Sequence, residues 1–246
     1  MTDMRVEYVT HYGDDLSPVN AARVSMNKQS DWEVVRYNEE VDVDSRTIIL
    51  VPQHMLSYKD RNLIAYLAKH KHTSCFEHQG ATLRLKVPIF IARQIQRHRT
   101  FSYNEVSRRY VDSAPEFYWP DKWRKRADNK KQGSSDEVFE TEPLVAIREW
   151  ERGQVVAAPS KLQSLMVAMY NGLVALGVAP EQARMILPQN MMVNWVWTGS
   201  LLGWAQMCKA RLADDAQRET QEFARKVQDV VAPLYPVSWD NLTRYL

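Results

Sequence analysis

Residues 81–110 read ATLRLKVPIFIARQIQRHRTFSYNEVSRRY, and this stretch decides the fold class. ATLRLKV alternates apolar with polar side chains, which predicts a half-buried strand because neighbouring side chains of a strand point to opposite faces. Pro88 suits the first turn of a helix, so PIFIARQIQRHR is predicted to be helical. After the polar turn TFSYN, residues 105–111 alternate again and predict a second strand. Strand and helix signals therefore follow each other closely here.

The flanking sequence adds several helices. RVEYVTHY near the start predicts a strand and PVNAARVSM a short helix. Residues 55–69 and 214–234 have the apolar spacing of amphipathic helices. A stripe from Leu162 to Leu176 predicts another helix, PEQARMIL a short one, and NWVWTGSLLGWAQMCKARL continues into an apolar helix. Strands and helices thus occur without regular alternation, which favours an α+β fold over a doubly wound sheet.

Two polar segments interrupt this pattern. Residues 27–50 are polar and poorly periodic, and residues 122–142 mix lysine, glycine, serine and acids without an apolar period. The second segment is predicted to be a long surface loop. We expect one domain over residues 1–246 that carries this excursion.

Composition excludes several classes of protein. The 246 residues include 32 Lys and Arg against 30 Asp and Glu, so a general nucleic-acid binder is not expected. No apolar run approaches the roughly 20 residues that span a membrane, and the first residues lack the profile of a signal peptide. The two cysteines show no CxxC spacing, which suits a reducing compartment. We therefore expect a cytoplasmic protein.

The densest chemistry lies in RHRTFSYNEVSRRY, residues 97–110. If the preceding segment is helical, Gln94, Arg97 and His98 share one face at its end. Guanidinium groups offer several donors in a fixed plane, which suits phosphates and the edges of planar heterocycles. The alternative is a solvated, salt-bridged surface turn, which is how most charge runs fold.

The second half of this stretch adds a carboxylate and a hydroxyl. If EVSRR is a strand, Glu105, Ser107 and Arg109 project from one side, and Val106 and Arg108 project from the other. Ser107 is not expected to be a nucleophile, because the chain has no GxSxG and no nearby histidine and acid in hydrolase order. The interleaved polar and apolar residues favour a shaped binding site over a surface turn.

This stretch resembles the signature of flavin-dependent thymidylate synthases, in which an Arg-His-Arg triplet precedes a serine after seven intervening residues. Residues 97–99 and Ser107 fill those positions. Other segments are similar to family segments in family order: VNAARVS, HTSCFEH, VPIFIARQ, EQARMILP and the Arg-x-x-x-x-Ala-Gln-x-Glu run at 211–219. The resemblance covers most of the chain and leaves out residues 122–142.

The resemblance implies fold, assembly and reaction. It implies a central mixed or antiparallel sheet flanked by helices, and a homotetramer with its sites at subunit interfaces. It implies reductive methylation of dUMP to dTMP with FAD, NADPH and the folate 5,10-methylenetetrahydrofolate, without a protein cysteine nucleophile. The cofactor then carries the difficult chemistry and the protein positions and polarises the substrate.

The resemblance also assigns residues to the site. Arg211 would be catalytic, because a cation at the pyrimidine edge stabilises charge on the ring and makes C5 more nucleophilic. The dUMP-binding residues would be Gln94, Arg97, Glu105, Val106, Ser107, Arg108, Arg109, Arg184 and Arg211. The FAD or folate side would be lined by His72, Ser74, Arg97, His98, Arg99, Glu105, Ser200, Leu201, Leu202 and Gln206.

Some of these residues have simpler explanations, and two positions depart from the family pattern. Arg184 could form only a helix-surface pair with Glu181. The histidine-rich KHKHTSCFEH could be a metal site, but no matching carboxylate or cysteine pattern accompanies it, so no metal is expected. Asp215 stands where the family often has histidine and Gln206 where it often has asparagine. These departures put local flavin or folate contacts in question.

Two other functions remain open. A nucleic-acid-binding module would use the basic clusters for phosphate contacts and Tyr103, Trp119 and Trp123 for stacking. A family member without activity would serve only as a flavin or nucleotide binder. The balanced charge weighs against the first alternative, and the intact signature weighs against the second.

Overall fold

The computed structural model describes residues 3–42, 47–111, 113–128, 134–149 and 153–246. Its contacts divide the chain into two compact units. The first unit comprises residues 1–7, 83–197 and 210–227, and the second unit comprises residues 8–82, 198–209 and 228–246. Strands and helices mix without regular alternation in both, so the predicted α+β class is confirmed.

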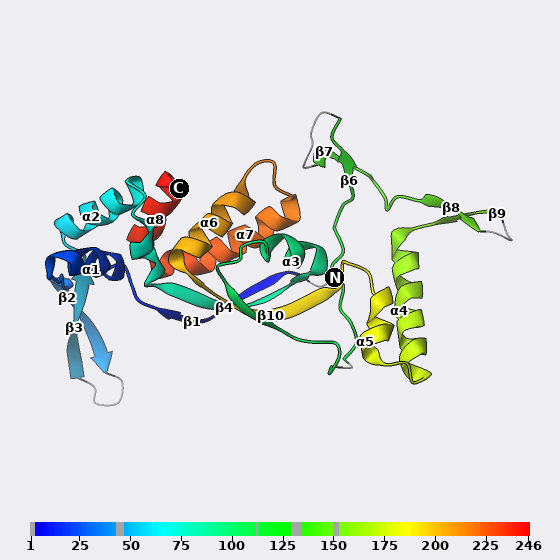
Figure 1. Cartoon of the computed structure of the whole chain (residues 1–246), viewed down its shortest axis with the longest axis horizontal. Coiled ribbons are helices and arrows are strands. Elements are labelled where there is room, and N and C mark those ends of the chain that lie inside the picture. Colours follow the sequence, from blue (N-terminus) through cyan, green and yellow to red (C-terminus); the bar gives the residue numbers. More distant parts are fainter. Residues whose placement is uncertain (1–2, 43–46, 112, 129–133, 150–152) are drawn as a thin grey trace. The chain divides into compact units, whose positions relative to one another are not determined.

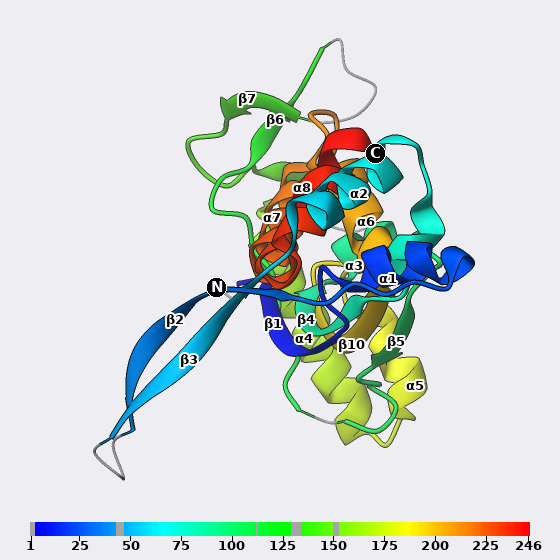
Figure 2. The ribbon, with the colours of Figure 1, turned by 90° about the vertical axis from the view of Figure 1, so that its left-hand side faces the viewer.

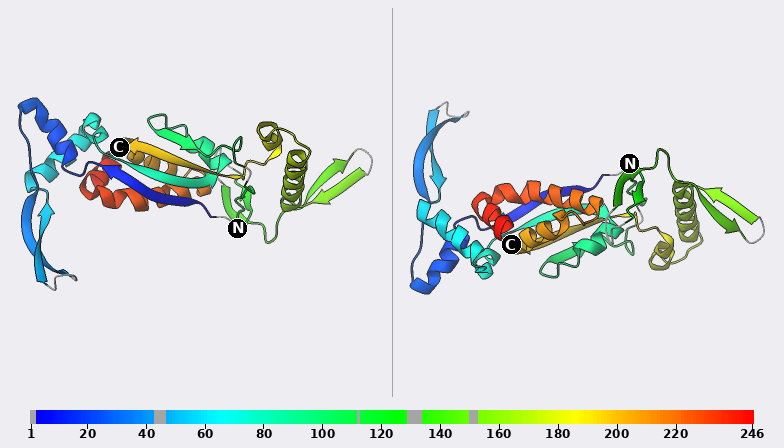
Figure 3. Two further views of the ribbon diagram at one scale, coloured as in Figure 1. Left: turned by 90° about the horizontal axis from the view of Figure 1, so that it is seen from below. Right: turned by 90° about the horizontal axis from the view of Figure 1, so that it is seen from above.

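A four-stranded antiparallel sheet is formed by β1 (Arg5–Tyr12), β4 (Gly80–Pro88), β10 (Met192–Ser200) and β5 (Ser102–Glu105), in the order β1-β4-β10-β5. Figure 3 shows β1 in blue, β4 in teal and β10 in gold as neighbours. The strand predicted from ATLRLKV is confirmed, because Leu83, Leu85 and Val87 are all fully buried along β4. The apolar and polar alternation therefore does mark the buried face of this strand.

One helix prediction and one strand prediction need correction. The segment after Asn194 is not helical from its start: β10 runs to Ser200, and α6 (Leu201–Leu212) follows. From Asn194 to Ser200, half-buried and buried residues alternate, which is the period of a strand. EVSRRYV is not a strand either, because β5 ends at Glu105. The amide of Tyr110 then donates to the Ser107 carbonyl, which turns the chain.

The helix before the signature is shorter than predicted. α3 covers Ile89–Ile95, and the Arg-His-Arg triplet lies beyond its end. The Gln96 amide still donates to Ala92, whereas the His98 amide donates to Ile95 and closes a turn. The triplet therefore lies on a turn at the end of the helix, where the side chains do not follow the 3.6-residue spacing of an α-helix.

Helices of the second unit confirm the remaining predictions near the start of the chain. PVNAARVSM folds into α1 (Ser17–Arg23) and η1 (Val24–Met26), and the next amphipathic segment gives α2 (Tyr58–Lys69). η2 (Thr73–Glu77) follows α2. Near the C-terminus, η4 (Ala232–Leu234) leads into α8 (Pro236–Tyr245), which packs against α2 (Figure 1).

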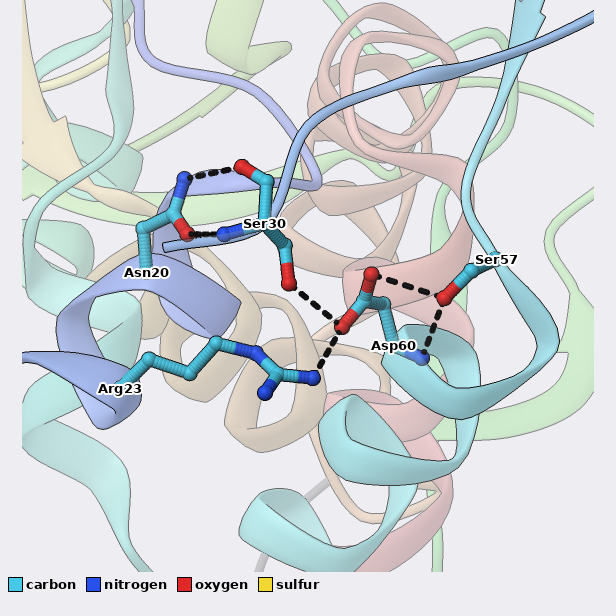
Figure 4. A network of polar contacts seen from close by, with 5 residues as sticks. All are labelled: Asn20, Arg23, Ser30, Ser57 and Asp60. Carbon is cyan, nitrogen blue, oxygen red and sulfur yellow. Dashed lines mark hydrogen bonds and ion pairs between the residues drawn. The ribbon is translucent and has the colours of Figure 1, made fainter. Parts of the chain in front are cut away.

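Asp60 ties the first helices of the second unit together (Figure 4). Its Oδ1 accepts from Arg23 Nη2 at 2.7 Å and from Ser30 Oγ at 3.0 Å. Its Oδ2 accepts from Ser57 Oγ at 2.8 Å, and Ser57 caps α2 by accepting from the Asp60 amide. Asn20 exchanges two hydrogen bonds with the Ser30 backbone. A buried carboxylate with this many donors holds α1, the following loop and α2 in fixed positions.

The polar segment after α1 is more ordered than its composition predicts. β2 (Glu33–Asp42) and β3 (Thr47–Met55) pair antiparallel from Glu33 with Met55 to Asp42 with Thr47, with a register shift between Val34 and Arg36. Figure 2 shows this hairpin as a long two-stranded ribbon. Backbone pairing, which apolar periodicity does not report, forms these strands.

The predicted surface excursion also contains strands. β6 (Arg124–Arg126) pairs with β7 (Ser134–Val138), and β8 (Val145–Glu149) pairs with β9 (Gly153–Ala157) just after it. The prediction of a loop was therefore wrong for residues 124–126 and 134–138. Residues 129–133 lie outside the described residues.

The later helices of the chain follow the predicted patterns. α4 (Pro159–Ala175) carries the predicted stripe and ends before Gly177, whose φ of 84° suits glycine at a helix end. α5 (Pro180–Ala183) and η3 (Arg184–Ile186) cover PEQARMIL. α7 (Arg218–Val231) is the amphipathic helix predicted near the C-terminus. Among the described helices, none is long and apolar enough to cross a membrane.

Candidate active site

Arg211 lies at the centre of a polar cluster in the first unit. It stands near the end of α6 and is half-buried. Its Nη2 donates to the Gln94 backbone oxygen at 2.8 Å, and its Nε donates to His98 Nε2 at 3.2 Å. Gln94, His98 and Arg211 were all predicted site residues, and the structure brings these three together.

The basic groups of this cluster lie close together in half-buried surroundings, which disfavours their protonated forms. Burial, and then the charge of Arg97, lowers the pKa of Arg211. Burial, and then the charge of Arg211, lowers the pKa of His98, so its imidazole stays neutral and can accept the Arg211 hydrogen bond. In the described part of the chain, no carboxylate forms an ion pair with Arg211. The cluster is thus suited to an anion or to a group that gains negative charge.

A second group of predicted residues lines a pocket of about 1140 Å³ in the first unit. Its walls include Glu105, Val106, Ser107, Arg108 and Arg184. Burial raises the pKa of Glu105, although a hydrogen bond from Gln96 and the charge of Arg184 oppose that rise. The pocket therefore combines a carboxylate, a hydroxyl and guanidinium groups.

The arginines around this pocket have different surroundings. Arg108 Nη1 donates to the Ser113 backbone oxygen at 2.7 Å. Arg109 lies over the Tyr110 ring at 5.0 Å, and its backbone N and Nε reach Ser107 Oγ at 3.3 and 3.4 Å. Arg109 is not among the residues that line the pocket. Arg184 and Glu181 both line it.

The residues predicted for the flavin or folate side are divided between the two units. Arg97 and Arg99 are exposed on the turn after α3 in the first unit. His98 and Glu105 also belong to the first unit. His72 and Ser74 belong to the second unit, where both are exposed at η2 and His72 stacks on Tyr66 with a ring separation of 6.0 Å. Ser200 Oγ accepts from the Gly203 amide at the start of α6.

Three further predicted residues continue along α6 in the second unit. Leu201 and Leu202 are buried, whereas Gln206 is exposed. Leu201 and Leu202 therefore offer their backbone more readily than their side chains to a ligand.

Neither cysteine has the character of a nucleophile. Cys75 and Cys208 are thiols outside any disulfide, and burial raises the pKa of both. A thiol with a raised pKa is a poor source of thiolate at neutral pH. Across the described residues, no three His, Cys, Asp or Glu side chains gather as they would around a metal ion.

Several residues beside the cluster were not predicted to take part in it. Gln217 and Thr220 bind the side chain of Gln94, and Arg124 binds Glu219. Gln217 and Glu219 belong to the quoted Ala-Gln-x-Glu motif, which was a usable signal. Arg124 lies in the excursion, and no motif distinguishes it.

Comparison with known proteins now adds to this geometry. A family model described as "Thymidylate synthase complementing protein" (Thy1) matches residues 7–237. The chain belongs to the Thy1 family of flavin-dependent thymidylate synthases. As a Thy1 member it is a flavin-dependent methyltransferase of dTMP biosynthesis.

The relatives of this Thy1 chain are similar over nearly all of its length. The flavin-dependent thymidylate synthase of Thermus thermophilus is 34% identical over 241 residues, which cover 98% of this chain and 76% of that protein. The enzyme of Thermosipho melanesiensis is 34% identical over 233 residues, covering 95% and 87%. Among solved structures, the UMP/dUMP methylase PolB from Streptomyces cacaoi bound with 5-Br dUMP has a TM-score of 0.71 at 25% identity, covering 99% of this chain and 96% of that one.

Proposed function

We propose that this Thy1 chain methylates dUMP to dTMP with FAD, NADPH and 5,10-methylenetetrahydrofolate, and that Arg211 activates the pyrimidine. The observation that carries this is the position of Arg211, whose guanidinium is fixed by a neutral imidazole and a backbone carbonyl. A guanidinium with such partners keeps its full charge for a ligand. The structural neighbour PolB was solved with a brominated dUMP, which supports a pyrimidine nucleotide as substrate.

The residues of the Arg211 cluster and of the pocket match the chemistry of dUMP. The phosphate needs cations, and we assign it to the arginines Arg97, Arg109 and Arg184 together with the Ser107 hydroxyl. Arg211 and Gln94 would hold the pyrimidine edge, because a donor at the ring oxygen stabilises the charge that develops there. Val106 and Arg108 would complete the wall around Glu105. The roles of the residues from Glu105 to Arg108 and of Arg184 rest on the pocket lining, and that of Arg211 rests on its contacts. The roles of Arg97 and Arg109, which do not line the pocket, rest on the family resemblance.

The residues after α3 fit the charge of a flavin dinucleotide. Its diphosphate is anionic, and Arg97 and Arg99 are exposed cations on either side of His98. FAD held by these residues would supply the redox chemistry that the methylation needs. We assign its contacts to Arg97, His98, Arg99 and Glu105, and those of the flavin or folate side to His72, Ser74, Ser200, Leu201, Leu202 and Gln206.

We further propose that the chain acts as one catalytic domain in a homotetramer with sites at subunit interfaces. α4 supports this proposal, because its predicted apolar stripe is not buried within the chain: Leu165 is 57% exposed, Met169 60% and Leu176 83%. A run of exposed apolar side chains on one helix is typical of a subunit interface. Two cysteines outside any disulfide suit the cytoplasm.

Tritium release from 5-tritiated dUMP tests the reaction. We expect release by the purified protein only when FAD, NADPH and methylenetetrahydrofolate are all present. Arg211→Ala should reduce release by about a hundred- to a thousandfold, while Arg244→Ala, which removes an arginine from an exposed pair with Asp240, should leave it unchanged. A folded, flavin-loaded protein without release would overturn the proposal and favour an inactive binder.

A further inference from the structure

A continuous chain of hydrogen bonds runs from the excursion to Gln94 within the first unit. Arg124 Nη2 meets Glu219 Oε1 at 2.5 Å. Gln217 Nε2 donates to Glu219 Oε2 at 2.9 Å, and Gln94 Nε2 donates to Gln217 Oε1 at 2.6 Å. Each residue therefore touches the next, from β6 at one end to α3 at the other.

The direction of every bond is set by Glu219. An ionised carboxylate can only accept, so it takes the amide NH₂ of Gln217 and leaves the Gln217 oxygen to face Gln94. Gln94 must then present its own NH₂ to Gln217, and its oxygen accepts from Thr220 Oγ1 at 3.0 Å. The amide plane of Gln94 is thus fixed on both sides.

The same residue supplies the backbone oxygen that binds Arg211. We infer that Arg124, Glu219 and Gln217 form a positioning relay that orients the side-chain amide of Gln94 for pyrimidine binding beside Arg211. This inference rests on the proposed function and assigns roles to residues that carry none in it. The relay residues do not contact substrate in this scheme and act through Gln94.

The surroundings of Glu219 keep its carboxylate ionised. Its side chain is only 8% exposed, and burial alone would raise its pKa. Hydrogen bonds from Arg124, from its own amide and from Gln217, together with the charge of Arg124, outweigh burial and lower the pKa. Without Arg124, burial would dominate and raise the pKa of Glu219. A protonated Glu219 can donate a hydrogen bond as well as accept one, so it no longer imposes one orientation on the Gln217 amide.

The relay also gives the excursion a role. Arg124 is held by Ser134 Oγ, which accepts from Arg124 Nε at 2.7 Å across the β6 and β7 pair. Trp123 and Arg124 line a cavity of about 470 Å³ together with Gln217 and Glu219. The excursion is therefore attached to the substrate-binding residues and its strands hold the cation that the relay needs.

The test compares Arg124→Ala, Arg124→Lys, Glu219→Gln and Gln217→Leu in the tritium-release assay with dUMP varied. We expect the KM for dUMP to rise about ten- to a hundredfold in Glu219→Gln and Gln217→Leu, as for lost hydrogen bonds to a charged group. Flavin content should stay close to that of the unchanged protein, whereas the Tm should fall in the variants that break the buried pair of Arg124 and Glu219, so KM is measured well below the Tm of each variant. Lys125→Ala, which removes the neighbouring exposed pair with Glu137, is the matched control and should leave KM unchanged.

A pH series separates positioning from simple stabilisation. In Arg124→Ala, the KM for dUMP should rise reversibly as the pH is lowered, because burial then raises the Glu219 pKa. The double variant Arg124→Ala with Glu219→Gln should lack this pH dependence, and Arg124→Lys should restore much of the wild-type profile. If the unchanged protein releases tritium but these variants keep its KM and pH profile, the relay is wrong. Absence of release from the unchanged protein would instead overturn the proposed function.

Discussion

The Arg211 Nε atom lies 3.2 Å from His98 Nε2, so a guanidinium donates to an imidazole that must be neutral. The partners of Arg211 therefore fix its guanidinium without neutralising its positive charge. This relationship makes both residues testable by different measurements.

Arg211→Ala should reduce the rate of tritium release by about a hundred- to a thousandfold, which is the usual effect of removing one group that stabilises developing charge. Arg211→Lys keeps the charge but not the fork that binds His98 and Gln94 together, so it should recover little of the loss. Flavin absorbance shows whether cofactor is retained. A rate in Arg211→Ala within a few-fold of the unchanged protein would exclude a role in activating the pyrimidine.

His98 predicts a pH dependence of stability. Its folded pKa is lowered, so the unfolded chain binds the proton more readily. The stability from neutral His98 should be fully present above its unfolded pKa of about 6.5 and should be lost as the pH falls below that value. In His98→Gln this part of the slope should disappear, as measured by denaturant unfolding between pH 5 and pH 8. An identical slope in both proteins would show that His98 does not titrate as inferred.

Asp60 lies far from Arg211 in sequence, and we expect its replacement to lower the free energy of unfolding. Asp60→Asn replaces one acceptor oxygen by a donor and leaves Arg23 without its carboxylate, so we expect about 2 to 4 kcal/mol of destabilisation. Hydrogen bonds from Arg23, Ser57 and Ser30 outweigh burial and lower the Asp60 pKa. Its contribution is therefore present above the unfolded pKa of about 3.9 and is lost as the pH falls through the lower folded value.

Urea unfolding monitored at pH 7 measures this loss, and Asp240→Asn is the matched control. Asp240 pairs with Arg244 on the surface of α8, where both side chains are mostly exposed. Its replacement should change the unfolding free energy by less than about 1 kcal/mol. Equal effects of the two substitutions would contradict the importance of burial at Asp60.

The sequence predicted local structure well where side-chain pattern and burial agree. Residues 81–87 alternate and form β4, whereas residues 105–111 alternate in the same way and form a turn. The difference lies in burial: Leu85 is fully buried, but Val106 and Tyr110 are exposed, so no sheet face stabilises the second stretch. The hairpin of β2 and β3 shows the reverse case, because its pairing depends on the backbone.

Sequence pattern predicted which site residues lie together only where those residues are close in sequence. Gln94 and His98 were expected to share a face and do bind one guanidinium, although the helix ends between them. Arg211 is 117 positions from Gln94, and Arg124 is 95 positions from Glu219. Contacts at such separations arise from tertiary packing, which a local pattern does not record. Family resemblance supplied Arg211, whereas Arg124 lies where that resemblance ends.

If the exposed apolar face of α4 forms a subunit interface, charge placed on it should dissociate the tetramer. Leu165→Glu combined with Met169→Glu places charge on side chains that are 57% and 60% exposed in the single chain. If this face is buried between subunits, charge there is costly, and the tetramer should dissociate at micromolar protein concentration. Light scattering after size-exclusion chromatography measures the mass. Lys161→Glu on the same helix is the control and should leave the mass unchanged, because it alters charge without changing an apolar side chain. Loss of tritium release together with dissociation would support sites built from several subunits, while a tetramer that survives both glutamates would place the interface elsewhere.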